Sequence, residues 1–304
     1  MDLDYFKKIR ILDGGMGQEL LARGMKPNGT LWSANALLDE KYHELLFNLH
    51  LDYIKSGAEV ICTTTFTTRR LRLRDNGVED KFEDLNKKAG EIAKKAQEKY
   101  PHVKIAGELP PQNFTYEADN RETDLITKNF NEQAKILNPY VDFFVLHVLS
   151  SIREFECSIE AIKEFKKPYL IGIHISEGTK LPSGEKISDI KKVFDENLLG
   201  VILTCISPEN FEQNFNELKN LNIPFGFKFN AFETTKTKDG YTVSYGKSNG
   251  NPNEFLGQRK DLTPEVIGNL TKKFKDNGAT ILGGCCETTP LHIRRISDIV
   301  KRDV

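Results

Sequence analysis

Eight short apolar runs, rich in β-branched residues, alternate along the chain with longer segments whose apolar residues recur every three or four positions. This alternation is typical of a parallel sheet built from β–α units, because parallel strands need long crossover connections. The expected strands are 9–13, 59–66, 103–109, 142–148, 168–175, 200–206, 224–230 and 280–286. The expected helices are 40–57, 78–100, 124–139, 152–166, 186–199, 208–221, 263–278 and 289–301. The pattern predicts an α/β protein, a single-domain (β/α)8 TIM barrel over residues 1–304.

Local signals support several of these boundaries. Ser207 and Thr289 each precede a proline at an expected first helical position, and Gly57 and Gly278 stand where helices should end. An open, doubly wound sheet is the competing architecture, because periodicity alone does not separate it from a barrel.

Composition excludes several classes of function. The chain has 43 Lys plus Arg against 44 Asp plus Glu, a net charge of −1, and no basic block, so a nucleic-acid partner is not expected. It shows no apolar stretch typical of a signal peptide or membrane span. Five cysteines in a chain of this length favour the reducing cytosol over a disulfide framework, and we therefore expect a cytoplasmic protein.

Chemistry-bearing residues gather where the expected strands end, which is where the active site of such a barrel lies. Asp13, His147 and Cys205 end the first, fourth and sixth expected strands. Cys285 and Cys286 end the eighth. We therefore expect three thiols from two strands to face one mouth.

A glycine pair, Gly283-Gly284, precedes the two adjacent cysteines and allows close approach of the backbone. Three thiolates with an open fourth position form a known catalytic arrangement for zinc, and soft sulfur favours zinc over magnesium or calcium. The alternative for any cysteine is packing as a small apolar side chain, which is the interpretation we keep for Cys62 and Cys157.

A long polar stretch, residues 233–259, follows the seventh expected strand. It is rich in glycine, asparagine and lysine and contains Pro252. We interpret it as a loop, and a loop at this point of a barrel lies over the mouth.

Four short motifs resemble the homocysteine S-methyltransferase family. They are Leu12-Asp13-Gly14-Gly15-Met16-Gly17, Leu31-Trp32-Ser33-Ala34, the stretch 50–66 with Ser56-Gly57-Ala58, and Gly283-Gly284-Cys285-Cys286. The resemblance extends over nearly the whole chain. It implies a zinc barrel that moves a methyl group from a small sulfonium or quaternary ammonium donor to homocysteine.

The resemblance also implies roles for particular residues. Cys205, Cys285 and Cys286 match the three zinc ligands, and Asp13 matches an acidic residue near the amino group of the thiol substrate. Zinc would lower the pKa of the substrate thiol, and an aromatic side chain such as Trp32 could hold the cationic donor. Phe66 is a second aromatic candidate, and core packing is an equally good interpretation of both rings.

Three positions depart from the family pattern. His147-Val148 stands where the family carries Glu-Thr, and Thr204 stands where Asn is usual. Glu108-Leu109-Pro110-Pro111 replaces a loop opened by Ser or Gly. With Asp13, the residues His147, Thr204 and Glu108 are thus the expected substrate contacts, and their differences predict an altered specificity.

His147 allows several interpretations: a structural histidine, a substrate contact, or a fourth zinc ligand. The leading hypothesis for the chain is a zinc-dependent methyltransferase acting on homocysteine. The alternatives are a divergent member acting on another small thiol or amine, and a barrel that binds zinc or a sulfur ligand without turnover. The expected partners are a small thiol acceptor and a small onium donor, and a homo-oligomer is allowed.

Overall fold

The centre of the computed structural model, which describes residues 1–236, 251 and 253–301, is an eight-stranded parallel sheet. The strands follow one another around it in the order β1-β8-β7-β6-β5-β4-β3-β2. A bridge between Leu12 and Val60 joins the two ends, so the sheet forms a nearly closed barrel. The strands are β1 (Arg10–Ile11), β2 (Val60–Cys62), β3 (Lys104–Leu109), β4 (Phe143–Leu149), β5 (Tyr169–Ile173), β6 (Leu198–Ile206), β7 (Phe225–Phe229) and β8 (Ile281–Gly284). The predicted (β/α)8 barrel is confirmed, and the open-sheet alternative is wrong.

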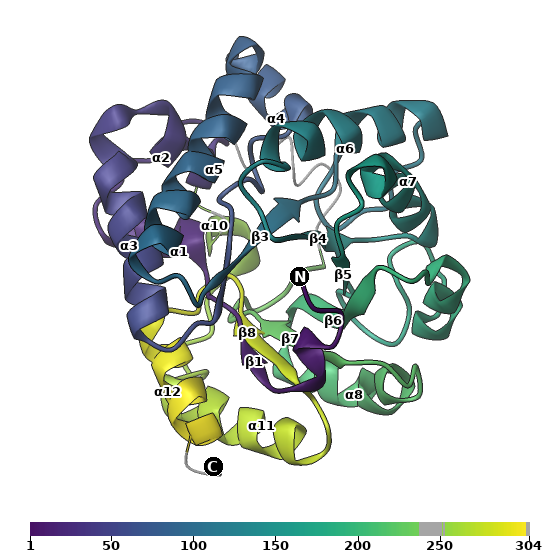
Figure 1. The fold of residues 1–304 in the computed structure, drawn as a ribbon. Coiled ribbons are helices and arrows are strands. Elements are labelled where there is room, and N and C mark those ends of the chain that lie inside the picture. Colours follow the sequence, from purple (N-terminus) through teal and green to yellow (C-terminus); the bar gives the residue numbers. More distant parts are fainter. Residues whose placement is uncertain (237–250, 252, 302–304) are drawn as a thin grey trace.

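Helices surround the strands as an outer ring (Figure 1). The α-helices are α1 (Met16–Ala22), α2 (Asn35–Leu38), α3 (His43–Lys55), α4 (Arg70–Asp75), α5 (Phe82–Lys99), α6 (Thr123–Leu137), α7 (Ile152–Ile162), α8 (Pro208–Lys219), α10 (Asn253–Leu256), α11 (Pro264–Asp276) and α12 (Pro290–Lys301). Short 3-10 helices are η1 (Tyr5–Lys7), η2 (Trp32–Ala34), η3 (Glu40–Tyr42), η4 (Glu79–Lys81), η5 (Lys163–Phe165) and η6 (Ile187–Val193). None of these described helices is long and apolar enough to cross a membrane.

The boundary signals act as expected where the structure describes them. The Ser207 hydroxyl accepts the backbone N–H of Asn210 at 3.2 Å, and Pro208 opens α8. Gly57 and Gly278 follow α3 and α11 with φ of 107° and 108°, a left-handed conformation that glycine adopts without strain.

One expected helix is wrong. Residues 186–199 contain only the 3-10 helix η6, and strand β6 already begins at Leu198. The apolar residues of η6 are Ile187, Ile190 and Val193, which repeat every three positions. A period of three matches the 3-10 helix, whereas the α-helix needs 3.6.

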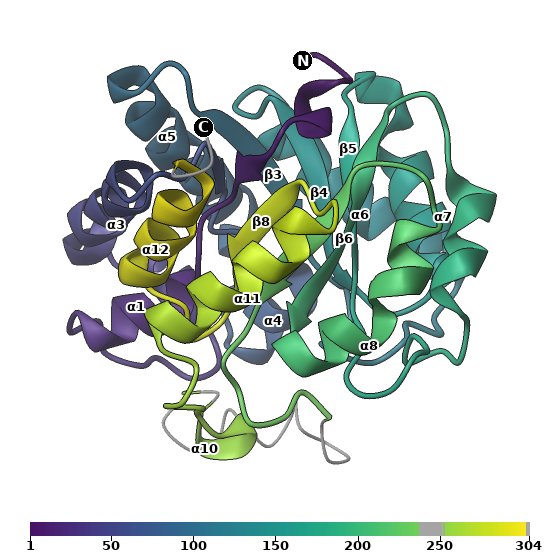
Figure 2. The same cartoon turned by 90° about the horizontal axis from the view of Figure 1, so that it is seen from below.

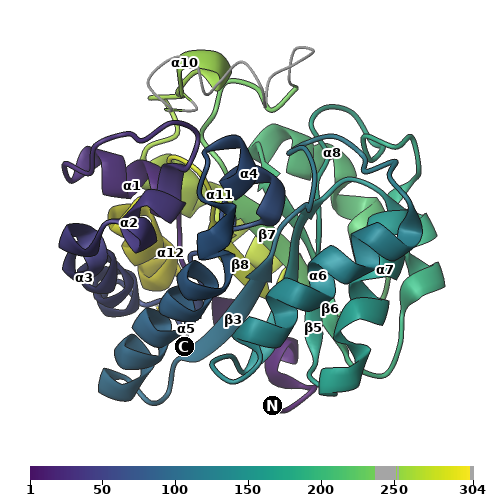
Figure 3. The same cartoon turned by 90° about the horizontal axis from the view of Figure 1, so that it is seen from above.

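The barrel has a filled interior at one end and an open mouth at the other. Phe6 of η1 packs inside the amino-terminal end with Phe143, Val145 and Leu170, among other apolar residues. Figures 2 and 3 show the N-terminal segment and α10 at opposite ends of the barrel. The mouth, at the carboxyl ends of the strands, therefore lies on the side of α10.

Strand β7 alternates strictly between the two faces of the barrel wall. Phe227 and Phe229 stack on each other outside, with ring centroids 3.7 Å apart, and Phe211 of α8 packs against both. Lys228, between the two phenylalanines, lies on the other face of the strand and points into the barrel.

The expected loop over the mouth is described only in part. Residues 237–250 and 252, including Pro252, lie outside the described residues. Of the described part, Leu256 of α10 belongs to the apolar cluster at the mouth that also contains Phe232 and the three cysteines.

Candidate metal centre and its cavity

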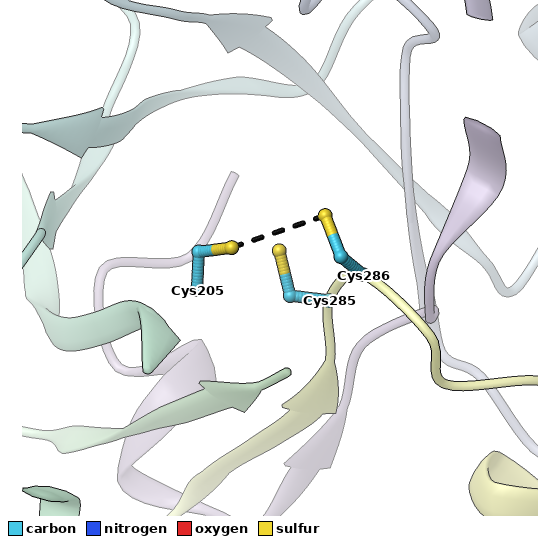
Figure 4. A group of neighbouring side chains, drawn as sticks. All are labelled: Cys205, Cys285 and Cys286. Atoms are coloured by element: carbon cyan, nitrogen blue, oxygen red, sulfur yellow. Dashed lines mark hydrogen bonds between the residues drawn. The ribbon is translucent and has the colours of Figure 1, made fainter. Parts of the chain in front are cut away.

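Three cysteine side chains meet at the mouth of the barrel (Figure 4). Cys205 lies near the end of β6, and Cys285 and Cys286 follow β8 directly. Their sulfur atoms all lie within 4.8 Å of one another, and those of Cys205 and Cys286 are 3.8 Å apart. All three are buried, so the group could hold a metal ion.

Local distortions of two strands direct side chains at this mouth. The pairing of β6 with β7 shifts between Thr204 and Ile206, and Cys205 at this bulge has φ of 52°. Strand β4 has a similar shift between Leu146 and Leu149, with Val148 at φ of 65°. A bulge re-aims a side chain, and positive φ is unfavourable for residues other than glycine, so the surrounding structure holds both conformations.

The glycine pair before the cysteines is required by packing. A Cβ on Gly284 would lie 2.1 Å from the Thr288 hydroxyl, and one on Gly283 would lie 2.8 Å from the Cβ of Leu12. The expected close approach of the backbone therefore occurs here, between β8 and the segments beside it.

Hydrogen bonds from two residues reach the sulfur of Cys205. The Tyr116 hydroxyl lies 3.0 Å from it and the Asn230 side-chain nitrogen 3.7 Å. Burial opposes ionisation of Cys205, but hydrogen bonds from the neighbouring thiols, Tyr116 and Asn230 outweigh it and hold its pKa well below the usual range. The pKa of Cys286 is raised in turn by its contacts with the other two cysteines and by burial. Cys205 thus loses its proton before Cys286 does.

A cavity opens directly above the cysteines. Its lining includes the three cysteines and three of the four expected substrate contacts, Asp13, Glu108 and His147. The fourth, Thr204, lies outside the lining. Its buried hydroxyl donates to the Ile173 carbonyl and accepts the Val148 N–H, so it links neighbouring strands, and its contact with substrate stays a prediction.

His147 and Glu108 form a buried pair on the cavity wall. The His147 Nδ1 lies 2.5 Å from the Glu108 Oε1. Burial alone would lower the pKa of His147, but the nearby Cys285 and Glu108 raise it to about 9. These contacts favour the protonated form of His147 beside Glu108.

Asp13 forms a second buried pair, with Lys228 of β7. The Lys228 Nζ donates to Asp13 Oδ1 at 2.7 Å and lies 3.6 Å from the sulfur of Cys62. Burial disfavours the charged Lys228, but Asp13 and the neighbouring sulfurs raise its pKa above the usual value. Both side chains are nearly inaccessible, at 3% exposed for Lys228 and 2% for Asp13.

Sequence reasoning missed Lys228 and Tyr116. A signal existed for Lys228, because a lysine inside an apolar strand run is rarely buried without an ionic partner. Tyr116 follows β3 in a connection without regular structure, and no sequence pattern marks it.

Cys62 was expected inside a strand, but β2 ends at this residue, which both packs in the core and lines the cavity. Cys157 packs in the core on α7, as expected.

Aromatic rings form much of the rest of the cavity wall. Trp32, Phe66, Tyr116 and Phe232 all line it, and Trp32 and Phe66 meet edge to face with centroids 6.3 Å apart. The Trp32 indole N–H donates to Gln18 at 2.7 Å, which fixes the orientation of the ring.

The sequence matches the family model described as homocysteine S-methyltransferase over residues 10–300. The chain belongs to this family. The predicted enzyme class, an S-methyltransferase, is thereby confirmed. The relatives span nearly the same length as this chain.

Homocysteine S-methyltransferase 2 of Saccharomyces cerevisiae is 24% identical, over 97% of this chain and 95% of that protein. A selenocysteine Se-methyltransferase of Brassica oleracea is 26% identical, over 94% of this chain and 87% of that protein. The metallated form of the homocysteine methyltransferase MmuM from Escherichia coli has the same fold, with a TM-score of 0.78, 21% identity and 96% coverage of both chains.

Proposed function

We propose that this protein transfers a methyl group from a small sulfonium or quaternary ammonium donor to homocysteine, giving methionine. A zinc ion held by Cys205, Cys285 and Cys286 would assist the reaction. The observation that carries the proposal is the meeting of three buried sulfurs from two strands beneath a partly aromatic cavity. Relatives named homocysteine and selenocysteine methyltransferases support the acceptor class.

The donor set fits zinc in chemistry and in spacing. Two sulfurs bound to a tetrahedral zinc at about 2.3 Å each are about 3.8 Å apart, and the sulfurs of Cys205 and Cys286 are 3.8 Å apart. Three thiolates leave one position for a substrate, which is typical of catalytic zinc. When bound, zinc supplies a Lewis acid that lowers the pKa of a thiol toward neutrality.

The residues around the cysteines support this chemistry by orientation and by excluding water. Tyr116 and Asn230 hydrogen-bond the sulfur of Cys205 and stabilise its ionised form. Phe232 and Leu256 lie in one apolar cluster with the three cysteines, which are all buried. The low accessibility strengthens electrostatic interactions within the site.

The aromatic wall suits a cationic donor. Trp32 and Phe66 can contact an onium centre through cation–π interactions. In the transfer, the acceptor thiol first loses its proton to solvent, and its sulfur then forms a bond to the methyl carbon. The bond from that carbon to the donor sulfur or nitrogen breaks, and its electron pair stays on the donor, which becomes neutral.

The test is methyl transfer by the zinc-loaded protein to deuterium-labelled homocysteine. The donor panel contains S-methylmethionine, dimethylsulfoniopropionate, betaine and S-adenosylmethionine, and labelled methionine is measured by mass spectrometry. The label separates methionine made from the acceptor from methionine released by a donor. Labelled methionine from one donor supports the proposal, and none from any donor, with zinc content confirmed, contradicts it. Cys285→Ser should abolish the product, whereas Cys157→Ser, on α7 outside the cavity lining, serves as the matched control.

A further inference from the structure

Each carboxylate inside the cavity already has a basic partner. Among the described lining residues, the carboxylates are Asp13 and Glu108. Lys228 holds the first at 2.7 Å, and His147 holds the second at 2.5 Å. Arg72 adds a further cationic side chain to the lining.

Both carboxylate oxygens of Asp13 are already engaged within the protein. Its Oδ1 accepts from Lys228, and its Oδ2 accepts the backbone N–H of Cys62 at 2.7 Å. A ligand ammonium placed here would have to displace Lys228 and would meet its like charge at close range. Like charges brought together at a desolvated site disfavour binding strongly.

The same pair can receive an anion. An ammonium group offers three donors, and the structure gives Lys228 two partners, Asp13 and the weakly accepting sulfur of Cys62. Lys228 pairs in register with Gly283, two residues before Cys285, and this offset corresponds to about 6.6 Å along the strand. A short thiol acid can span such an offset with its sulfur near the cysteines and its carboxylate toward Lys228.

We propose that the cavity recognises its thiol acceptor through the carboxylate and requires no α-ammonium group, and that Lys228 sets this specificity. The acceptor class is then the small thiol carboxylates, with or without an amino group. This inference rests on the proposed function, since it concerns the acceptor of the same methyl transfer.

Three acceptors that share one thiol-bearing carbon chain test the inference. Homocysteine carries both groups, 4-mercaptobutyrate lacks the ammonium, and 3-aminopropanethiol lacks the carboxylate. Their dissociation constants are measured by calorimetry on the zinc-loaded protein, and their kcat/KM values with the donor found active. We expect 4-mercaptobutyrate to bind at least as tightly as homocysteine and at least tenfold more tightly than 3-aminopropanethiol.

Variants at position 228 assign the preference to this residue. Lys228→Met should reduce the preference for 4-mercaptobutyrate over 3-aminopropanethiol at least tenfold, while Lys228→Arg should retain it. The matched control is Lys236→Met, which removes an exposed lysine paired with Glu177 and should leave the preference unchanged. If Lys228→Met does not fold, the double variant Asp13→Asn/Lys228→Met provides the comparison, because no carboxylate is then left unpaired.

The outcomes distinguish a failure of this inference from a failure of the proposed function on which it rests. Methylated homocysteine together with tenfold weaker binding of 4-mercaptobutyrate overturns the inference and leaves the proposed function intact. No methyl transfer to any of the three thiols overturns the proposed function, and the binding constants still decide the charge preference. An unchanged preference in both the single and the double variant removes Lys228 as its cause.

Discussion

Asp13 and Lys228 form a buried ion pair, and we expect their contributions to the stability of the metal-free protein to be strongly coupled. Their charged atoms are 2.7 Å apart and their side chains are almost wholly inaccessible. At an effective dielectric constant of 20, two unit charges at this distance attract by about 6 kcal/mol, which offsets the cost of removing both from water. Lys228→Met deletes one charge and leaves the Asp13 carboxylate buried alone. We expect it to lower the free energy of unfolding by about 3 to 5 kcal/mol.

The double variant Asp13→Asn/Lys228→Met should recover most of that loss. The amide oxygen introduced by Asp13→Asn can still accept the Cys62 N–H, and no buried charge remains without a partner. Urea unfolding of chelator-treated wild type, both single variants and the double variant, followed by circular dichroism, gives the coupling energy of the cycle. A coupling below about 1 kcal/mol would refute the reasoning, because it would mean that the two groups do not share a dry environment.

Three further predictions concern the metal, a buried carboxyl and the acceptor. Cys205→Ser should lose stoichiometric zinc as measured by mass spectrometry of the desalted protein, whereas Cys157→Ser should keep it; full occupancy in both would contradict the ligand assignment. Burial raises the pKa of Glu154 to about 7 in the folded protein, whereas in the unfolded chain this carboxyl ionises from about pH 4.5. As the pH rises, ionisation therefore favours the unfolded chain, and the fold loses up to about 3 kcal/mol of stability by pH 8. Glu154→Gln should lack this loss in urea titrations at pH 5 and pH 8, and parallel curves for both proteins would disprove the assignment. His147→Glu should raise the ratio of kcat/KM for homocysteine to kcat/KM for 4-mercaptobutyrate. An unaltered ratio would show that residue 147 does not interact with the amino group of the acceptor.

The fold was predictable because strand and helix periods repeat eight times in the chain. A barrel needs only this repetition, and errors at single boundaries, such as the assignment of 186–199 as an α-helix, do not change it. The meeting of Cys205, Cys285 and Cys286 was predictable for the same reason, since carboxyl ends of parallel strands share one edge.

The electrostatics of the cavity could not be predicted in the same way. Pairing of Asp13 with Lys228 joins residues 215 positions apart, and it depends on side chains that cross the barrel interior. The Tyr116 contact depends on an irregular connection, and the orientation of Cys205 depends on a bulge. None of these features leaves a periodic trace in the sequence.

The two faces of β7 have different roles: the outward phenylalanines pack the barrel wall, and the inward Lys228 lines the cavity. A shift of this strand by one residue would turn Phe227 and Phe229 into the barrel and Lys228 outward against Phe211, so the outer stacking locks the position of the charge. The inward residue, by contrast, contributes nothing to that stack. Position 228 can therefore be exchanged together with position 13 while the outer packing is retained, so the charge inside the barrel can change without a change in the wall that supports it.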